Sequence, residues 1–137
     1  VSFSAMKHWL MGHNAPSDLD KVRDLDVELI LPGHGDVFTG LADRVDYLKE
    51  FHAKRLEELY GLVASGHASI IDIARSASWK HGDWDEWSLD QKFYSLGETF
   101  AHLVYLVNEG RVAMTICQNK RRFYVPDQWD VRYREDV

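Results

Sequence analysis

One short segment of the sequence has the residue types of a metal-binding loop. Residues 31–36 read Leu-Pro-Gly-His-Gly-Asp and follow an apolar run at 27–31 that predicts a buried strand. The glycines beside His34 let the backbone turn sharply and approach a ligand closely, and a neutral imidazole is the commonest metal ligand. A zinc site needs three or four protein donors. His34 is therefore either a turn residue or one ligand of a site whose other donors lie elsewhere, in this chain or outside it.

The remaining histidines do not form an obvious set of partners. None lies in an H-x-H or H-E-x-x-H arrangement; they are His8, His13, His52, His67, His81 and His102. The richest group of donors, at residues 81–86, has tryptophans around it at 79, 84 and 87. Because buried aromatic side chains usually pack against one another, we expect a packed aromatic loop there.

The larger part of the sequence predicts three helices followed by a β-hairpin. Apolar residues recur at helical spacing in two long stretches, and two β-prone stretches follow them. The expected elements are helices over residues 43–64, 69–77 and 88–110 and strands over 111–117 and 122–126, joined by 118–121. This is the element order of a winged helix.

Local signals mark the ends of these helices. Ser69 and Ser88 each begin a capping-box pattern, and Gly66 and Gly110 are expected to stop the helices before them. The spacing of apolar residues also predicts the buried face of the third helix, namely Leu89, Phe93, Leu96, Phe100, Leu103, Val104 and Val107.

Residues 1–42 differ from this helical unit. Residues 4–11 could form one or two helical turns, and Pro16 with a Ser-x-x-Asp pattern opens a short helix to about Asp24. The strand at 27–31 would be alone, with unpaired backbone groups on both edges, so it needs neighbours from elsewhere. We therefore expect two domains, residues 1–42 and residues 43–137, with no placement for the charged and aromatic tail at 127–137.

The order and spacing of several segments resemble the C-terminal part of metallo-β-lactamase-fold hydrolases, over about residues 25 to 116. More narrowly, they resemble the branch with a winged-helix-like C-terminal domain. The segments are Pro-Gly-His-Gly at 32–35, the helix with His52 and Arg55, Ile-Asp-Ile-Ala at 71–74, Ala-His-Leu-Val-Tyr-Leu at 101–106 and Glu-Gly-Arg-Val at 109–112. The resemblance implies a mainly α fold with a small β component: a helix–strand remnant of an αββα fold, then a winged-helix-like three-helix domain with a β-hairpin.

The resemblance also implies a metal site. In that family the histidine of Pro-Gly-His-Gly binds the second of two metals, so His34 is the metal ligand it assigns here, with zinc as the expected metal. Two such metals lower the pKa of a bridging water and polarise the substrate's carbonyl or phosphoryl oxygen. The family's main motif, H-x-H-x-D-H, is absent from this sequence. We therefore expect the C-terminal portion of a larger hydrolase, which needs an N-terminal metallo-β-lactamase-fold domain and binds no metal alone.

The resemblance leaves the substrate and several roles open. Relatives cleave small thioesters, lactams or lactones, and some cleave RNA, and nothing here selects among them. The C-terminal domain would cap the cleft, shape the substrate pocket or mediate a homodimer. His52 and Arg55 either face the substrate or form one solvated polar edge of a helix.

Three other side chains have ordinary interpretations. Asp36 either orients His34, as carboxylates beside ligand histidines often do, or caps the loop. His102 lies between apolar neighbours and is expected to be a partly buried structural residue. Cys117 lacks a cationic neighbour that would activate its thiol, so we expect it to pack.

Composition sets broad limits on function. The chain of 137 residues has 45% hydrophobic residues, enough for a core, and a net charge of −6, which argues against a general nucleic-acid-binding surface. The one cysteine excludes an internal disulfide and fits a reducing, cytoplasmic compartment. No apolar run approaches the length of a membrane span, and no signal peptide is visible.

Two non-enzymatic alternatives remain. A winged-helix module could bind nucleic acid through the basic hairpin tip at 120–122, but the third helix carries Asp90, Glu98 and Glu109 against Lys92, whereas a phosphate-facing helix should be basic. A protein-interaction module could instead pair the strand at 27–31 with another chain.

Overall fold

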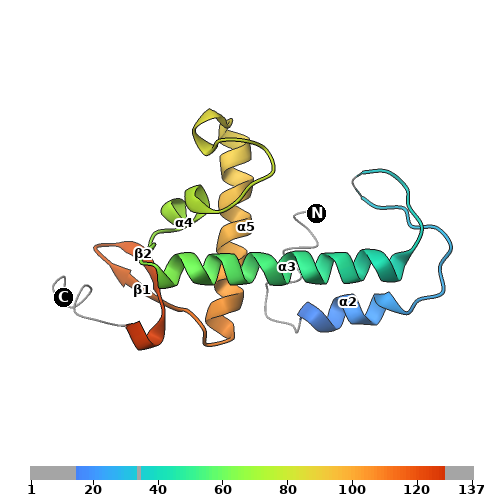
Figure 1. The fold of residues 1–137 in the computed structure, drawn as a ribbon, viewed down its shortest axis with the longest axis horizontal. Helices are drawn as coiled ribbons and strands as arrows, with labels where there is room; N and C mark the ends of the chain where they lie inside the picture. Colours follow the sequence, from blue (N-terminus) through green and yellow to red (C-terminus); the bar gives the residue numbers. More distant parts are fainter. Residues whose placement is uncertain (1–14, 34, 129–137) are drawn as a thin grey trace. The chain divides into compact units, whose positions relative to one another are not determined.

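The computed structural model describes residues 15–33 and 35–128 (Figure 1). These residues form four α-helices, two short 3-10 helices and one two-stranded antiparallel sheet. The elements are α2 (Ala15–Arg23), α3 (Leu41–Ala64), α4 (Ile70–Ser76), η1 (Trp84–Glu86), α5 (Leu89–Asn108), β1 (Ala113–Cys117), β2 (Lys120–Tyr124) and η2 (Pro126–Gln128). The prediction of a mainly helical fold with a small β component is confirmed. The predicted turns at 4–11 and the tail after Gln128 lie outside the described residues.

The chain divides into two compact units, residues 1–55 and 56–137. The long helix α3 contributes residues to both units. The sequence predicted two domains, residues 1–42 and 43–137. A division into compact units does not test whether each domain folds on its own, so the domain boundary stays a prediction.

Helix ends follow the local signals in the sequence. The Ser88 hydroxyl accepts a hydrogen bond from the Gln91 amide while the Gln91 side chain accepts one from the Ser88 amide, a complete capping box. Ser69 caps α4 by accepting from the Asp72 amide. Gly66 and Gly110 have φ values of 107° and 71°, a left-handed conformation that glycine adopts without steric cost.

Both glycines complete the same hydrogen-bonded stop. After α3, the amide of Gly66 donates to the Val63 carbonyl and that of His67 to the Leu62 carbonyl, and the pattern repeats after α5. These two bonds define a Schellman motif, which satisfies carbonyls that the helix end leaves open. The predicted glycine stops are therefore confirmed.

The core of the second unit draws on every element from the end of α3 to the residue after β2. Helix α4 packs against α5, β2 contacts α4, and β1 contacts α5. Its buried apolar residues include Leu59, Val63, Ile73, Leu103, Leu106, Val112 and Phe123. The predicted buried face of α5 is wrong at its N-terminal end, because Leu89 and Phe93 are 84% and 67% exposed.

The hairpin has a tighter turn than predicted. Its register pairs Ala113 with Tyr124 and Cys117 with Lys120. Only Gln118 and Asn119 lie between the strands, with φ values of 50° and 59°. Two consecutive residues with positive φ form the type I′ turn that matches the twist of antiparallel strands.

Candidate functional site

The Pro-Gly-His-Gly segment lies in a loop that is closed at its base by one antiparallel bridge. The Ile30 amide donates to the Phe38 carbonyl at 2.9 Å, and the Phe38 amide donates to the Ile30 carbonyl at 3.2 Å. Gly35 has a φ of +87°, which a side-chain-bearing residue rarely adopts. The loop therefore turns at a glycine beside His34. His34 itself lies outside the described residues, so its predicted role as a metal ligand stays a prediction.

The stretch before the loop does not form the buried strand that its apolar residues predicted. Among the described residues, only Ile30 of this stretch pairs, and its partner is Phe38. The residues from 24 to 29 are all exposed. Among the apolar ones of this stretch, Leu25 is exposed by 55%, Val27 by 43%, Leu29 by 59% and Leu31 by 76%. The physical reason is that no neighbouring strand of unit 1 is present in the described residues to pair with this backbone or cover this apolar row.

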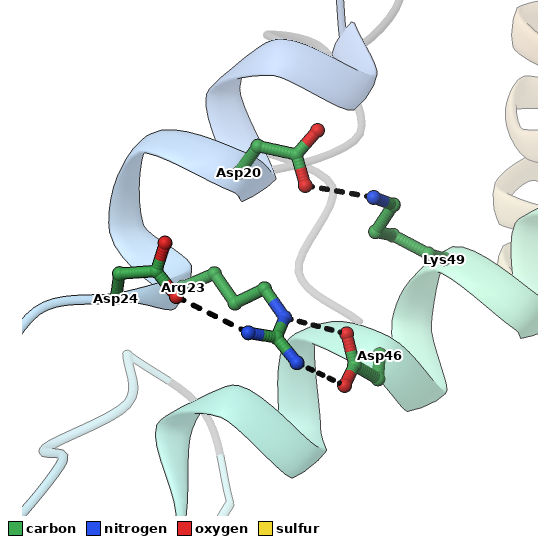
Figure 2. A network of polar contacts seen from close by, with 5 residues as sticks. All are labelled: Asp20, Arg23, Asp24, Asp46 and Lys49. Carbon is green, nitrogen blue, oxygen red and sulfur yellow. Dashed lines mark hydrogen bonds and ion pairs between the residues drawn. The ribbon is translucent and has the colours of Figure 1, made fainter.

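Ion pairs between α2 and α3 tie together the two ends of the segment that carries the loop (Figure 2). The Arg23 guanidinium donates twice to the Asp46 carboxylate, at 2.8 and 2.7 Å, and once to Asp24 at 3.1 Å. Lys49 donates to Asp20 at 2.7 Å. The hydrogen bonds from Arg23 hold the pKa of the Asp46 carboxyl below its usual range. These contacts hold the end of α2 beside α3. They therefore fix the positions of the two helices between which the loop segment runs.

Helix α3 carries a second polar group in unit 1. His52 and Arg55 are only 5% and 8% exposed, so the interpretation as a solvated helix edge is wrong for this structure. Burial lowers the pKa of His52 to about 4, and the charge of Arg55 adds to the effect. The Phe51 ring lies edge-on to the imidazole with 5.4 Å between centroids. His52 is therefore neutral at pH 7, and its predicted substrate-facing role stays a prediction.

The described part of the chain holds no group of three or more histidine, cysteine, aspartate or glutamate residues that could bind a metal ion. Asp36 is exposed, and its predicted role in orienting His34 depends on a residue that is not described. One imidazole cannot hold a zinc ion on its own. Any metal near this loop would need donors beyond the described residues.

The loop at 79–87 is a packed aromatic cluster, as predicted. Trp84 and Trp87 are buried with 5.4 Å between ring centroids, and Trp79 lies edge-on to Trp87 at 5.7 Å. The indole of Trp87 donates to the His81 carbonyl at 2.9 Å, and that of Trp79 to the Ala74 carbonyl at 2.7 Å. The cluster connects α4 to α5 and has a structural role.

Two other side chains match their ordinary interpretations. His102 is fully buried in α5, deeper than the expected partial burial, and its Nδ1 lies 2.8 Å from the Glu98 carbonyl oxygen. Cys117 is half-buried at the end of β1.

Sequence reasoning missed the pairs between α2 and α3. Each joins residues 23 or 29 positions apart. One signal was available in the sequence. Asp20 and Arg23 lie three residues apart on one helix, and their oppositely charged partners, Lys49 and Asp46, lie three residues apart on the other. That match places complementary charges on facing turns.

Two solved structures resemble this chain over most of its length. A beta-lactamase domain protein from Burkholderia ambifaria matches with a TM-score of 0.67 and 26% sequence identity. A metallo-beta-lactamase family protein from Thermus thermophilus matches with a TM-score of 0.60 and 23% identity. Each match covers 81% of this chain and 32% of the other chain, so this chain spans about a third of their length.

These likenesses support a relationship to metallo-β-lactamase-fold proteins, and the coverage is consistent with one part of such a fold. No family model matches the chain, and a search of curated proteins found no match. None of the helices among residues 15–33 and 35–128 is long and apolar enough to cross a membrane.

Proposed function

We propose that this chain is the C-terminal part of a metal-dependent hydrolase with the metallo-β-lactamase fold. In this proposal its Pro-Gly-His-Gly loop brings one metal ligand, His34, to an active site that residues outside this sequence complete. The observation that carries the proposal is the structural likeness to metallo-β-lactamase proteins over 81% of the chain. Zinc is the metal that we expect.

The arrangement of unit 1 supports a loop that acts together with another part of a protein. The Ile30–Phe38 bridge closes the loop. The ion pairs that join α2 to α3 hold in place the two helices between which the loop segment runs. The exposed row from Leu25 to Leu31 is apolar at every second residue, which suits one face of a strand in a larger sheet. The roughly two thirds of the matched structures that this chain does not span could supply such a sheet.

The metal chemistry would depend on that other part. A pair of zinc ions would activate a water molecule as the nucleophile, and His34 would hold one ion in place. The described residues do not form a metal site by themselves, so we assign no catalytic step to them.

The second unit would shape the substrate cleft or mediate dimer formation. Its three helices and hairpin follow winged-helix order, and the Phe123 amide bonds to the Ala68 carbonyl at 2.9 Å, which attaches the hairpin to the connection between α3 and α4. The matched structures do not favour the nucleic-acid-binding alternative, and the acidic residues of α5 oppose it.

The test is His34→Ala in the complete protein, with His81→Ala as the matched control. His81 is an exposed histidine in the aromatic loop of the other unit. Because even changes behind a metal ligand cost about 10–100-fold, loss of His34 should lower turnover at least that much. It should also lower the zinc content measured by elemental analysis.

The control should keep the parent's turnover and zinc content, and circular dichroism should show both variants folded. Equal turnover and equal zinc content in His34→Ala and the parent would show that His34 is a turn residue.

A further inference from the structure

The outer edge of β1 has backbone groups that pair with no strand of the described residues. Phe123 lies opposite Met114 in the hairpin, yet the Phe123 amide donates away from β1, to the Ala68 carbonyl. Phe123 and Met114 are therefore a non-hydrogen-bonded pair, in which both backbones point away from each other. The amide and carbonyl of Met114 face the outer edge of β1, and those of Ile116, two residues further along, do so too.

This edge lacks the features that normally protect a strand edge. Natural edge strands carry charged residues, prolines or bulges that prevent pairing with other strands. Strand β1 reads Ala-Met-Thr-Ile-Cys, with no charge and no proline, and its register has no bulge. Met114 and Ile116 are 42% and 69% exposed. Both the backbone and the side chains of this edge therefore suit a further strand with an apolar face.

The register of β1 allows a second copy of the same strand to pair with it about a two-fold axis. In an antiparallel pair centred on Thr115, Met114 of one copy lies opposite Ile116 of the second copy, and such residues exchange both of their backbone hydrogen bonds. Every outward-facing amide and carbonyl of β1 is then used. A shifted pair would need Val112, whose amide already donates to the end of α5, or Gln118, which has a φ of 50°.

The charges of the hairpin permit this pairing. β1 has no charged residue, and the basic residues of the hairpin lie on β2, namely Lys120, Arg121 and Arg122. In a sheet with the order β2–β1–β1–β2, the two β2 strands are three spacings apart, about 14 Å, which exceeds the Debye length of about 8 Å at physiological salt. Repulsion between the basic residues of the two copies is therefore screened, while the exposed apolar side chains of β1 meet.

We propose that two copies of this chain associate through the outer edges of β1, in an antiparallel pair centred on Thr115. Met114 and Ile116 of both copies then form one apolar cluster on a single face of a four-stranded sheet. A pair of five-residue strands is smaller than a standard interface of roughly 800 Å² per partner, so the dimer is weak and depends on protein concentration. The proposal takes up the dimer role given to the second unit but rests on this strand edge, so its failure leaves the proposed metal site untouched.

Cysteine cross-linking of the full chain tests the register. Thr115→Cys, in a Cys117→Ser background that removes the free thiol, brings two cysteines across the axis with about 4.5 Å between Cα atoms, a distance that a disulfide spans. In Met114→Cys, in the same background, the two Cα atoms are about 9 Å apart, too far for a disulfide. Mild oxidation should therefore cross-link Thr115→Cys at least about tenfold faster than Met114→Cys.

The same comparison can overturn the proposed register. Met114 is 42% exposed and Thr115 is half-buried, so random collisions between monomers favour Met114→Cys. Cross-linking of Met114→Cys at an equal or higher rate would overturn the pairing centred on Thr115.

Sedimentation equilibrium of the full chain tests whether the dimer forms without a covalent link. The average mass of the parent should rise towards that of a dimer between about 1 μM and about 1 mM. Ile116→Lys places a charge in the apolar cluster and should weaken association at least about tenfold. Ile71→Lys is the matched control, because Ile71 is 58% exposed in α4, away from this edge, and it should associate like the parent.

Circular dichroism should show both lysine variants folded, because both isoleucines are exposed. A parent that stays monomeric at about 1 mM would overturn the proposal. Association that Ile116→Lys and Ile71→Lys weaken equally, or that neither weakens, would also overturn it, because the dimer would then form through another surface.

Discussion

The two units of this chain differ in how their apolar residues are used. In the second unit, Leu59, Leu103 and Leu106 are fully buried. In the segment that leads to the Pro-Gly-His-Gly loop, Leu29 and Leu31 are more than half exposed. Both regions contain leucines, so the residue type alone does not show which of them are buried.

The difference shows that two apolar segments of one chain can contribute very differently to its stability. The loop segment holds its shape through one backbone bridge and a few exposed ion pairs. The second unit has its own core, capped helices and a paired hairpin. We infer that the second unit carries the folding free energy, while the loop segment depends on a partner surface.

Substitution of one leucine in each region gives the largest expected effect. Leu103→Ala leaves a cavity among fully buried side chains, so it should lower the free energy of unfolding by about 2–5 kcal/mol. Leu29→Ala removes a side chain that is 59% exposed, so it should change that free energy by less than about 0.5 kcal/mol. Urea denaturation followed by tryptophan fluorescence measures both.

The same pair of variants can show whether the loop segment contributes less to stability than the second unit does. If Leu29→Ala in this chain costs as much as Leu103→Ala, the loop segment belongs to the core after all. If the cost of Leu29→Ala appears only when the rest of the proposed hydrolase is present, the missing surface covers this row.

The burial of His52 predicts a smaller effect that depends on pH. Its pKa is about 4 in the folded chain and 6.5 in the unfolded chain. Between these values the unfolded chain binds a proton that the folded chain does not, so stability should fall as pH drops from 6.5 towards 4. The full loss is about 3 kcal/mol at most. Urea midpoints between pH 5 and 7 should show the slope.

His52→Gln should flatten this slope, because glutamine does not titrate. His67→Gln is the matched control: His67 is half-exposed and pairs with Asp72 at 2.7 Å. If the dependence of stability on pH is the same in His52→Gln as in the parent, the His52 imidazole is exposed to solvent in the folded chain. The burial of His52 in unit 1 would then not persist in solution.

Sequence predicted those parts of the fold that depend on neighbouring residues. The capping box at Ser88 and the glycine stops each arise within six residues of chain, and the hairpin joins two strands that are adjacent in sequence, so their signals are local. The burial of Leu89 and Phe93 was predicted wrongly because periodicity shows which side chains share a face, not how far a neighbour covers it. Helix α5 has 20 residues and α4 only 7, so α4 cannot cover its whole length.

The candidate site was predictable only as a loop. The glycines around His34 identified the turn, and Gly35 confirms it with its positive φ. The strand at 27–31 was wrong because a strand requires partners that local sequence does not contain. The burial of His52 and Arg55 was also missed, since two polar residues on an amphipathic helix usually indicate its solvent side.

The contacts of Arg23 predict the smallest effect and test how independent the loop segment is. The Arg23 and Asp46 side chains are 38% and 50% exposed to solvent, so their paired hydrogen bonds stabilise the fold only weakly. Arg23→Ala should therefore leave the second unit unchanged but release the end of α2 from α3. Exchange of the Ile30 and Phe38 amides should become faster by less than about fivefold.

Arg75→Ala, which removes an exposed ion pair with Asp85 in the other unit, is the matched control and should leave the exchange of these amides unchanged. Because salt screens exposed pairs, 1 M sodium chloride should produce in the parent chain the same acceleration that Arg23→Ala produces at low salt. If Arg23→Ala has no effect at low salt, the bridge between Ile30 and Phe38 alone holds the loop closed.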